Sequence, residues 1–381
     1  MSPSQVPETQ IFHDTTTVAR HATDELLIDR RSLSEHQQSV IEELAFQYGS
    51  VPESYDIAVS HGHVLPTPCG RGVMSVLADG RFWHIAGGML APRDLRPQLI
   101  HWLRDVSSNH NRTIAVYNVS RTDAEQFRDE GFVVNKFGEE PVLDPRQVDW
   151  CGKQFEWIRR QSNFCVRAGI EIAEVKDSDE RQQLAETLVS IMSDDLFGRT
   201  FDRPLRLLEG EFVPHTLRRR RLFVARSETD GHVEAFLACS PIDGGRGWAF
   251  ETYRKRKNAT RGITAFLFRT VIDRLRNEGT EKISLCLIPG RNVTQCSIGE
   301  GDWRVEKALS LWFNQLNFLF NTKGQDHFKS RFRPRYVDRY ICVAPHSSVR
   351  SLWSFLKTTG ATNGNWWNML RQLRKSVSEP P

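Results

Sequence analysis

The sequence has 381 residues, of which 39% are hydrophobic and 26% are charged, and 51 basic side chains against 47 acidic ones give a net charge of +4. These proportions are ordinary for a folded soluble protein, and the length predicts two domains. The small excess of positive charge excludes a role for the whole molecule as a binder of polyanions, so any such role must depend on local clusters.

The seven cysteines are scattered and form no CxxC pair, which argues against a structural zinc site or a disulfide framework. His61 and His63 alone are too weak a motif for a metal site, so we predict none. The N-terminus lacks the pattern of a signal peptide, and no apolar run approaches the ~20 residues of a membrane span. We therefore expect a cytoplasmic protein.

The first 32 residues are polar and aperiodic and predict a flexible arm. A first domain, 33–150, then follows from hydrophobic spacing. Its predicted elements are a helix from Leu33, strands at 55–60, 72–78 and 81–87, a helix at 94–106, a strand at 113–120, a helix at 121–130 and a strand at 132–137.

The second domain, 151–345, repeats this order without any repeat of the letters themselves. Its predicted elements are a strand at 170–175, a helix at 179–192, strands at 222–226, 233–240 and 248–253, a helix at 262–277, a strand at 282–288, a helix at 304–320 and a strand at 336–343. This is the element order of the GNAT acyltransferase fold. The sequence therefore predicts an α/β (α+β) protein of two tandem GNAT-like folds with mixed sheets flanked by helices, and a basic, aromatic tail at 346–381.

GNAT enzymes that use acetyl-CoA carry a Gly-rich turn before a long helix, where backbone N–H groups hold the pyrophosphate. The corresponding stretch here, RKRKNATRGITAFLF (254–268), has only Gly262, with bulky cations in place of the other glycines. We therefore predict no CoA and no other cofactor, and expect another donor to deliver the acyl group.

The stretch FKSRFRPRYVDRYI (328–341) carries five basic side chains and one acid, Asp338. Aromatic residues recur among them at every fourth position, from Phe328 to Tyr340. Such a local concentration of cations in a chain of nearly balanced charge predicts a segment that holds an anionic, activated substrate.

Together with five further motifs in the same order, this stretch resembles the catalytic domain of the lysyl- and alanyl-phosphatidylglycerol synthases, which consists of two tandem GNAT folds. The resemblance runs from about Tyr55 to Val343. The five other motifs are GFVVNKFGEEPVLD (131–144), GKQFEWIRRQSNFCVRAG (152–169), ETYRK (251–255), RGITAFLF (261–268) and SLCLIPG (284–290). The resemblance implies an aminoacyltransferase that moves an aminoacyl group from aminoacyl-tRNA to a hydroxyl, often on phosphatidylglycerol.

The resemblance also implies roles for matching residues. Lys329 matches the family's functional lysine, and we expect it to be exposed in a cleft. There it would contact the oxyanion or the terminal phosphate of the tRNA. Glu251 and Arg254 match a catalytic Asp and Arg, and Glu251 either holds the substrate's α-amino group, relays a proton or forms a simple surface ion pair. The residues expected to bind substrate are Arg331, Arg339, Ser284 and Gly262.

Further cations predict tRNA contacts, since phosphate contacts supply most nonspecific nucleic-acid affinity. Lys153 and Arg159 match family positions on one helix, with an ordinary solvated face as the alternative. Arg218 and Arg219 begin an unbroken RRRR run. The tail WWNMLRQLRK (366–375) suits an anionic membrane surface, nucleic acid or packing on the body, and we favour peripheral contact with the inner face of the membrane.

Two departures from the family leave the amino acid and the acceptor open. Ala265 stands where the family has an acidic residue, and Cys286, Leu287 and Ile288 replace small residues. The membrane domain that usually precedes this catalytic unit is not in the sequence. The resemblance therefore supports aminoacyl-tRNA as the donor more strongly than a lipid as the acceptor. The alternatives are transfer to a peptide, sterol or small metabolite, and a non-catalytic module that binds RNA or a partner.

Overall fold

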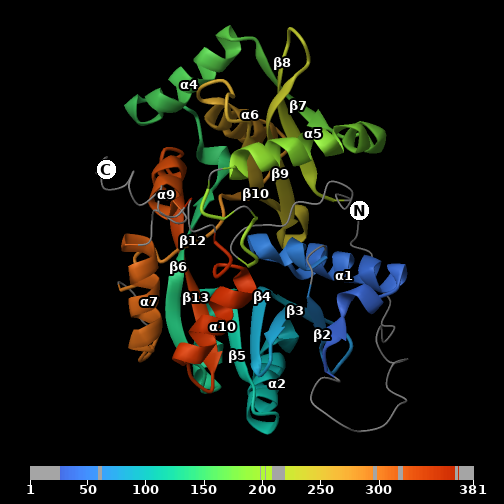
Figure 1. Cartoon of the computed structure of the whole chain (residues 1–381), viewed down its shortest axis with the longest axis vertical. Helices are drawn as coiled ribbons and strands as arrows, with labels where there is room; N and C mark the ends of the chain where they lie inside the picture. Colours follow the sequence, from blue (N-terminus) through green and yellow to red (C-terminus); the bar gives the residue numbers. More distant parts are fainter. Residues whose placement is uncertain are drawn as a thin grey trace.

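The computed structural model describes residues 26–58, 62–197, 199–201, 203–207, 219–294, 298–315, 321–364 and 368. Through this part of the chain runs one mixed sheet of 13 strands with helices on its faces (Figure 1). The predicted α/β fold class of mixed sheets flanked by helices is confirmed. Most of the predicted N-terminal arm and most of the tail beyond 364, including 369–375, lie outside the described residues.

The first half contributes an N-terminal helix, a three-stranded meander and two strand–helix units. Its elements are β1 (Ile28–Asp29), α1 (Glu35–Tyr48), the 3-10 helix η3 (Pro52–Ala58), β2 (His63–Pro66), β3 (Val73–Asp79), β4 (Phe82–Leu90), α2 (Arg96–Asn109), β5 (Thr113–Val119), α3 (Arg121–Asp129) and β6 (Val133–Leu143). The start of α1 is set by Ser34, whose side chain accepts from the Gln37 backbone N–H while the Gln37 side chain binds back, as in a capping box.

The second half repeats the arrangement and has further helices before and after its last strand. Its elements are α4 (Glu156–Arg167), β7 (Ile170–Val175), α5 (Ser178–Leu196), β8 (Arg221–Ser227), β9 (Val233–Ile242), β10 (Gly247–Lys255), α6 (Ile263–Asn277), β11 (Lys282–Ser284), β12 (Ile288–Pro289), α7 (Trp303–Asn314), α9 (Thr322–Ser330), β13 (Arg335–Ala344) and α10 (Val349–Thr359). In both halves the third strand of the meander pairs in parallel with the next strand, β4 with β5 and β10 with β11.

The two halves exchange their last strands. In the order β5-β13-β6-β11, the final strand of the second half lies between the last two strands of the first half, and β6 pairs with β11 of the second half. Figure 1 shows β6 and β13 side by side across the middle of the molecule. The predicted domain boundary at 150/151 stays a prediction, whereas the sheet itself is continuous from one half to the other.

Apolar side chains fill the space between the sheet and its helices in each half. In the second half, α6 packs on β8, β9 and β10, with Phe250 and Phe268 fully buried and in edge-to-face contact. In the first half, Trp83, Ile100 and Phe127 lie in a second buried cluster between the sheet and the helices α2 and α3. The predicted helices and strands that form these cores are found close to their expected positions.

Several predicted elements are wrong. Residues 55–58 belong to η3 rather than to a strand, because Pro52 fixes a φ angle that suits the first turn of a helix. The strand predicted at 282–288 breaks at Cys286, whose φ of 67° no strand accommodates. The elements β1, β2, α9 and α10 were not predicted, and β1 lies within the arm expected to be flexible. Residues 316–320 of the predicted helix at 304–320 lie outside the described residues.

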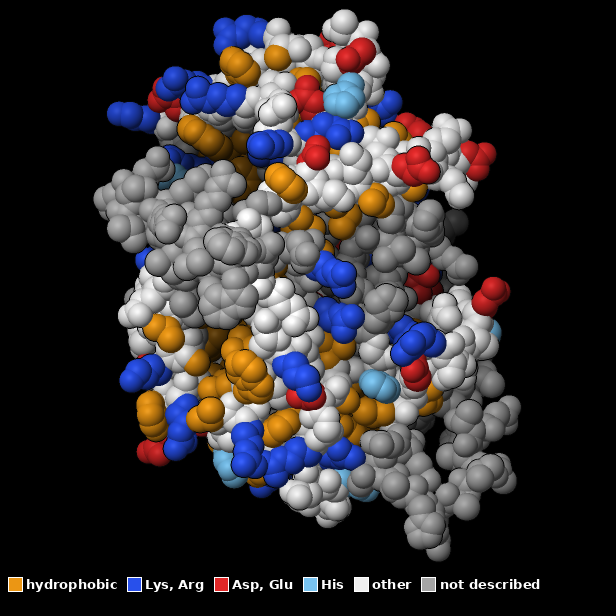
Figure 2. Space-filling view, viewed as in Figure 1, with side chains coloured by type: hydrophobic (Ala, Val, Ile, Leu, Met, Phe, Trp, Pro, Cys, Tyr) orange, Lys and Arg blue, Asp and Glu red, His pale blue; other side chains and the backbone are white. Residues whose placement is uncertain are grey.

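None of the helices in the described residues has both the length and the apolar character that crossing a membrane requires. Basic side chains are spread over the face drawn in Figure 2, among acidic and hydrophobic ones. This distribution agrees with the nearly balanced charge of the chain.

Candidate active site

Buried polar and charged side chains gather where the two halves of the sheet meet. Glu140 on β6, Arg339 on β13 and Ser284 on β11 are 0%, 6% and 0% exposed. The Arg339 Nε donates to Glu140 Oε2 at 2.6 Å, so the charges are paired. Burial alone would raise the pKa of Glu140, but the charges of Arg339 and Lys282, together with hydrogen bonds from Ser284 and Arg339, hold that pKa below its usual value.

Lys329, in the last turn of α9, lies at this seam. The prediction that Lys329 is exposed is wrong, because α9 turns the side chain toward the sheet and leaves the residue only 2% exposed. Its Nζ donates to the Cys286 carbonyl oxygen at 3.0 Å. Burial lowers the pKa of the Lys329 ammonium, and the nearby Cys286, Asp326 and Glu140 oppose that shift.

Cys286 connects Lys329 to the neighbouring strands. Its left-handed backbone interrupts the strand between β11 and β12. Its N–H donates to Ser284 Oγ at 3.1 Å, and its Sγ donates to the Phe250 carbonyl oxygen at 3.3 Å. Burial raises the pKa of the thiol well above its usual value, so Cys286 stays a neutral hydrogen-bonding group near pH 7.

Glu251 on β10 is held by a buried network rather than by a surface ion pair. The side chain of Glu251 is 4% exposed and that of Arg220 is 1% exposed, with Arg220 Nη2 donating to Glu251 Oε1 at 3.0 Å. Arg220 Nε also donates to Ser240 Oγ at 2.9 Å, and that hydroxyl donates to Glu251. The alternative of a simple surface ion pair is therefore wrong, and Arg220 is a member of the site that sequence reasoning missed.

Glu53 on η3 is a second missed member. Its carboxylate accepts a hydrogen bond from Asn118 Nδ2 on β5. Burial raises the pKa of Glu53 to about 7, and the negative charge of Glu140 adds to this, while Asn118 and Arg339 act in the opposite direction. Only proximity to Tyr55, at the edge of the resemblance, could have drawn attention to it from the sequence.

Three other predicted site residues, Arg254, Arg331 and Arg159, contact partners outside this group of buried side chains. Arg254 contacts Asp195 on α5, with 3.4 Å between Nε and a carboxylate oxygen. The Arg331 guanidinium lies 5.7 Å from the centre of the Trp157 ring. Arg159 donates to the carbonyl oxygens of Trp150 and Gly152 at 2.6 and 2.8 Å, which fixes the turn before α4. The structure therefore brings together Lys329, Arg339, Ser284 and Glu251.

The described residues predicted to contact tRNA also lie apart from this buried group. Lys153 is exposed just before α4. Arg219 pairs with Glu43 on α1, and its guanidinium lies 4.2 Å from the Phe46 ring centre. Arg218 lies outside the described residues. The roles assigned to these cations stay predictions.

Gly262 caps the N-terminus of α6 with φ +82°, and a Cβ there would lie 2.6 Å from Gln161 Oε1 and 2.7 Å from Gln161 Cβ. Because strain and clash add, we expect Gly262→Ala to lower the free energy of unfolding by more than the ~1–3 kcal/mol of left-handed backbone strain alone. The matched control is Gly279→Ala, which has φ +83° and nothing within 4 Å. Equal urea midpoints for the two variants would contradict the predicted contact with Gln161.

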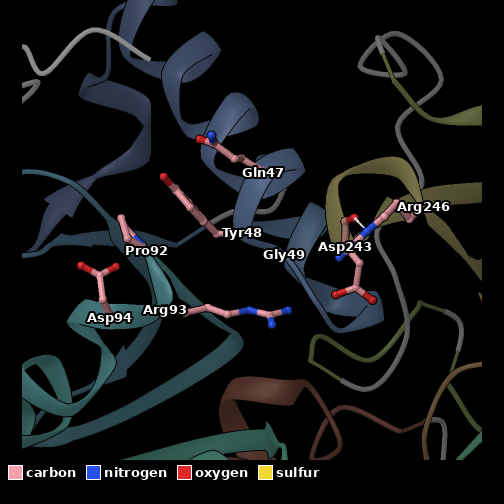
Figure 3. Close-up of a pocket in the computed structure, with 8 residues that line it drawn as sticks. All are labelled: Gln47, Tyr48, Gly49, Pro92, Arg93, Asp94, Asp243 and Arg246. Atoms are coloured by element: carbon pink, nitrogen blue, oxygen red, sulfur yellow. Dashed lines mark hydrogen bonds between the residues drawn. The ribbon is translucent and has the colours of Figure 1, made fainter. Parts of the chain in front are cut away.

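Two of the hollows in the described part of the structure share Arg93 in their lining, and one of them also reaches the buried Arg339. One, of about 380 Å³, is lined by Ser50, Arg93, Arg96, Ser120, Thr122, Asp123, Gln126, Lys282 and Arg339. The other, of about 350 Å³, lies between α1 and the turn before β10, and Figure 3 shows Arg93 extending across it toward Asp243 and Arg246. Arg93 lines both hollows and forms no ion pair with a described residue, so a cation is available there for an anionic ligand.

Within the described residues no three His, Cys, Asp or Glu side chains are arranged to hold a metal ion. The chemistry available at the seam is that of a buried ammonium, two buried arginines and three carboxyl groups in different states of pairing. Such a set can stabilise developing negative charge and move protons.

A family model described as "phosphatidylglycerol lysyltransferase, C-terminal" matches residues 48–343. The lysylphosphatidylglycerol biosynthesis bifunctional protein LysX of Rhodococcus jostii is 21% identical over 321 residues, 82% of this chain and 28% of that protein. The phosphatidylglycerol lysyltransferase of Bacillus subtilis is 22% identical over 72% of this chain and 31% of that protein. The chain thus spans less than a third of the length of these curated relatives.

Solved structures agree with the fold. The structure of L-PGS from Bacillus licheniformis superposes with a TM-score of 0.70 and 19% identity, covering 86% of this chain and 97% of that one. The C-terminal domain of a lysylphosphatidylglycerol synthetase from Agrobacterium fabrum gives a TM-score of 0.69 and 18% identity, covering 87% and 98%.

Proposed function

Because this chain belongs to the phosphatidylglycerol lysyltransferase C-terminal family, we propose that it transfers an aminoacyl group from aminoacyl-tRNA to a hydroxyl of a lipid such as phosphatidylglycerol. The observation that carries the proposal is the buried Lys329 ammonium at the seam, beside Cys286 and within electrostatic reach of Glu140. The aminoacyl ester of tRNA is already activated. The protein therefore has to position two substrates and stabilise a tetrahedral oxyanion.

Lys329 supplies the charge for the oxyanion. An ammonium that is only 2% exposed acts through a medium of lower dielectric than water, so its attraction for a developing negative charge is stronger than that of a surface lysine. Its hydrogen bond to the Cys286 carbonyl oxygen fixes the direction of the side chain before substrate binds. This preorganisation lowers the cost of arranging charge at the moment of reaction.

A phosphate group is expected in the hollow that borders Arg339. The hollow of about 380 Å³ is lined by Arg93, Arg96, Lys282 and Arg339 but by a single acid, Asp123. Arg96 is already paired with Asp123 at 2.9 Å, which leaves Arg93 as the cation most available to a new anion. The phosphodiester of the lipid or the terminal phosphate of the tRNA fits this charge pattern.

The experiment that tests the function mixes the purified protein with tRNAs charged with radiolabelled amino acids and with vesicles that contain phosphatidylglycerol. We expect label to move into the organic phase, and sorting by amino acid then names the substrate. Loss of label from tRNA without a lipid product would keep the donor and redirect the acceptor to a soluble molecule. Bound tRNA that retains all its label would contradict an enzymatic role.

A further inference from the structure

The carboxyl group of Glu53 faces the seam from the first half, whereas Lys329 comes from the second half. Glu53 lies on η3, between α1 and the meander, and its carboxylate accepts from Asn118 Nδ2. Beyond it lies the buried Glu140–Arg339 pair. The negative charge of Glu53 raises the pKa of both Lys329 and Cys286. The carboxyl group therefore lies within electrostatic reach of the ammonium assigned to the oxyanion.

Two buried oxygens next to this carboxyl group have no hydrogen-bond donor among the described residues. They are Asn118 Oδ1 and Glu140 Oε1. A buried acceptor that stays unpaired costs free energy, and most such groups in folded proteins are satisfied by protein, water or ligand. Asn118 Oδ1 and Glu140 Oε1 are therefore two acceptors open to a donor from a bound molecule. A hydroxyl group is such a donor.

We propose that Glu53 is the general base that takes the proton from the attacking hydroxyl of the acceptor. The inference rests on the proposed aminoacyl transfer. As the hydroxyl oxygen bonds to the ester carbonyl carbon, its proton passes to the Glu53 carboxylate and the carbonyl oxygen becomes the oxyanion beside Lys329. When the intermediate collapses, the bond to the ribose oxygen of the tRNA breaks, and the protonated Glu53 returns the proton to that oxygen. One ester bond forms and one breaks, and no co-reactant is consumed.

The acid–base state of Glu53 suits this task. The pKa of about 7 arises mainly from burial, so both protonation states are populated near neutral pH. The charged and titratable groups around it come from four other segments, and its neighbour on β5 is the neutral Asn118. They are Glu140 on β6, Arg339 on β13, Cys286 between β11 and β12, and Lys329 on α9.

The test replaces Glu53 with the isosteric glutamine, whose carbonyl oxygen can still accept from Asn118. General base catalysis contributes about 100- to 10,000-fold, so we expect kcat/KM of Glu53→Gln to fall by at least about 100-fold with tRNA affinity unchanged. The matched control is Glu125→Gln on α3, which removes an exposed carboxylate paired with Arg121 and is expected to keep full activity. Thermal unfolding of both variants checks that they are folded.

The pH profile of the unmodified protein gives a check that needs no variant. Because the base is the carboxylate form, kcat/KM should rise about tenfold per pH unit below pH 7 and level off above it. Glu53→Gln should lose that inflection. A wild-type profile without an inflection near 7, or a variant that raises only KM and keeps the profile, would overturn the role of Glu53. Absence of transfer by the unmodified protein would instead overturn the proposed function itself.

Discussion

Replacing Lys329 with methionine is expected to reduce aminoacyl transfer by about 100- to 1000-fold, the usual effect of removing one oxyanion donor. Methionine has nearly the same length as lysine, so it fills the same buried space without a charge. The variant leaves the Cys286 carbonyl oxygen without its partner at 3.0 Å, at a cost of about 1–3 kcal/mol in stability. The measurement is the single-turnover rate of label transfer with saturating aminoacyl-tRNA, beside a thermal unfolding curve.

Lys323→Met is the matched control because Lys323 is on the same helix, α9, and is exposed. We expect this variant to transfer at the wild-type rate, with a slightly weaker affinity for tRNA if the whole helix contributes to the field. Wild-type transfer by a folded Lys329→Met would remove Lys329 from the reaction. Loss of the folded state in Lys329→Met alone would assign it a structural role.

Arg339→Met is expected to destabilise the fold more than any other single substitution proposed for this protein. It leaves the carboxylate of Glu140, 0% exposed, without the guanidinium that holds it, and breaking a buried pair in this way costs about 3–5 kcal/mol. Urea unfolding at pH 7 measures the loss. The double variant Arg339→Met with Glu140→Gln should recover much of it, because the uncompensated charge is then gone.

The same variant should show a distinctive dependence on pH. In the unmodified protein the pKa of Glu140 is lowered, so the pair contributes stability above the unfolded pKa and loses it as pH falls through the folded pKa. Without Arg339, burial would raise the pKa of Glu140, so the carboxyl group would be neutral in the acid range. The difference in unfolding free energy between variant and wild type should therefore shrink as pH falls, first through the raised pKa of Glu140 in the variant and then below about 4.5, where the wild type loses the contribution of the pair. A constant difference would exclude this pair as its source.

The regular elements follow from the sequence because apolar residues recur at the period of a helix or a strand, as at α6 and β9. The interruption at Cys286 does not, since nothing in the letters SLCLIPG signals a positive φ at a cysteine. Tertiary contacts accompany that conformation, namely the hydrogen bonds to Lys329 and Phe250.

The candidate site was only partly predictable for the same reason. Lys329, Arg339, Ser284 and Glu251 could be found because they lie within recognisable motifs. Glu53 could not be found, because its significance depends on the distant Asn118 and on burial beside β6. A carboxyl group's environment is a property of the folded chain, whereas its identity alone is a property of the sequence.

The exchanged strands also bear on how the molecule is made. During synthesis β5 and β6 are complete long before β13, Arg335–Ala344, leaves the ribosome. Until then the edges of β5 and β6 that pair with β13 are uncovered, and uncovered edges of this kind pair readily with other chains. The nascent first half is therefore the stage at which this protein is most exposed to aggregation. The insertion of β13, which brings Arg339 to Glu140, is the step that both protects the sheet and assembles the candidate site.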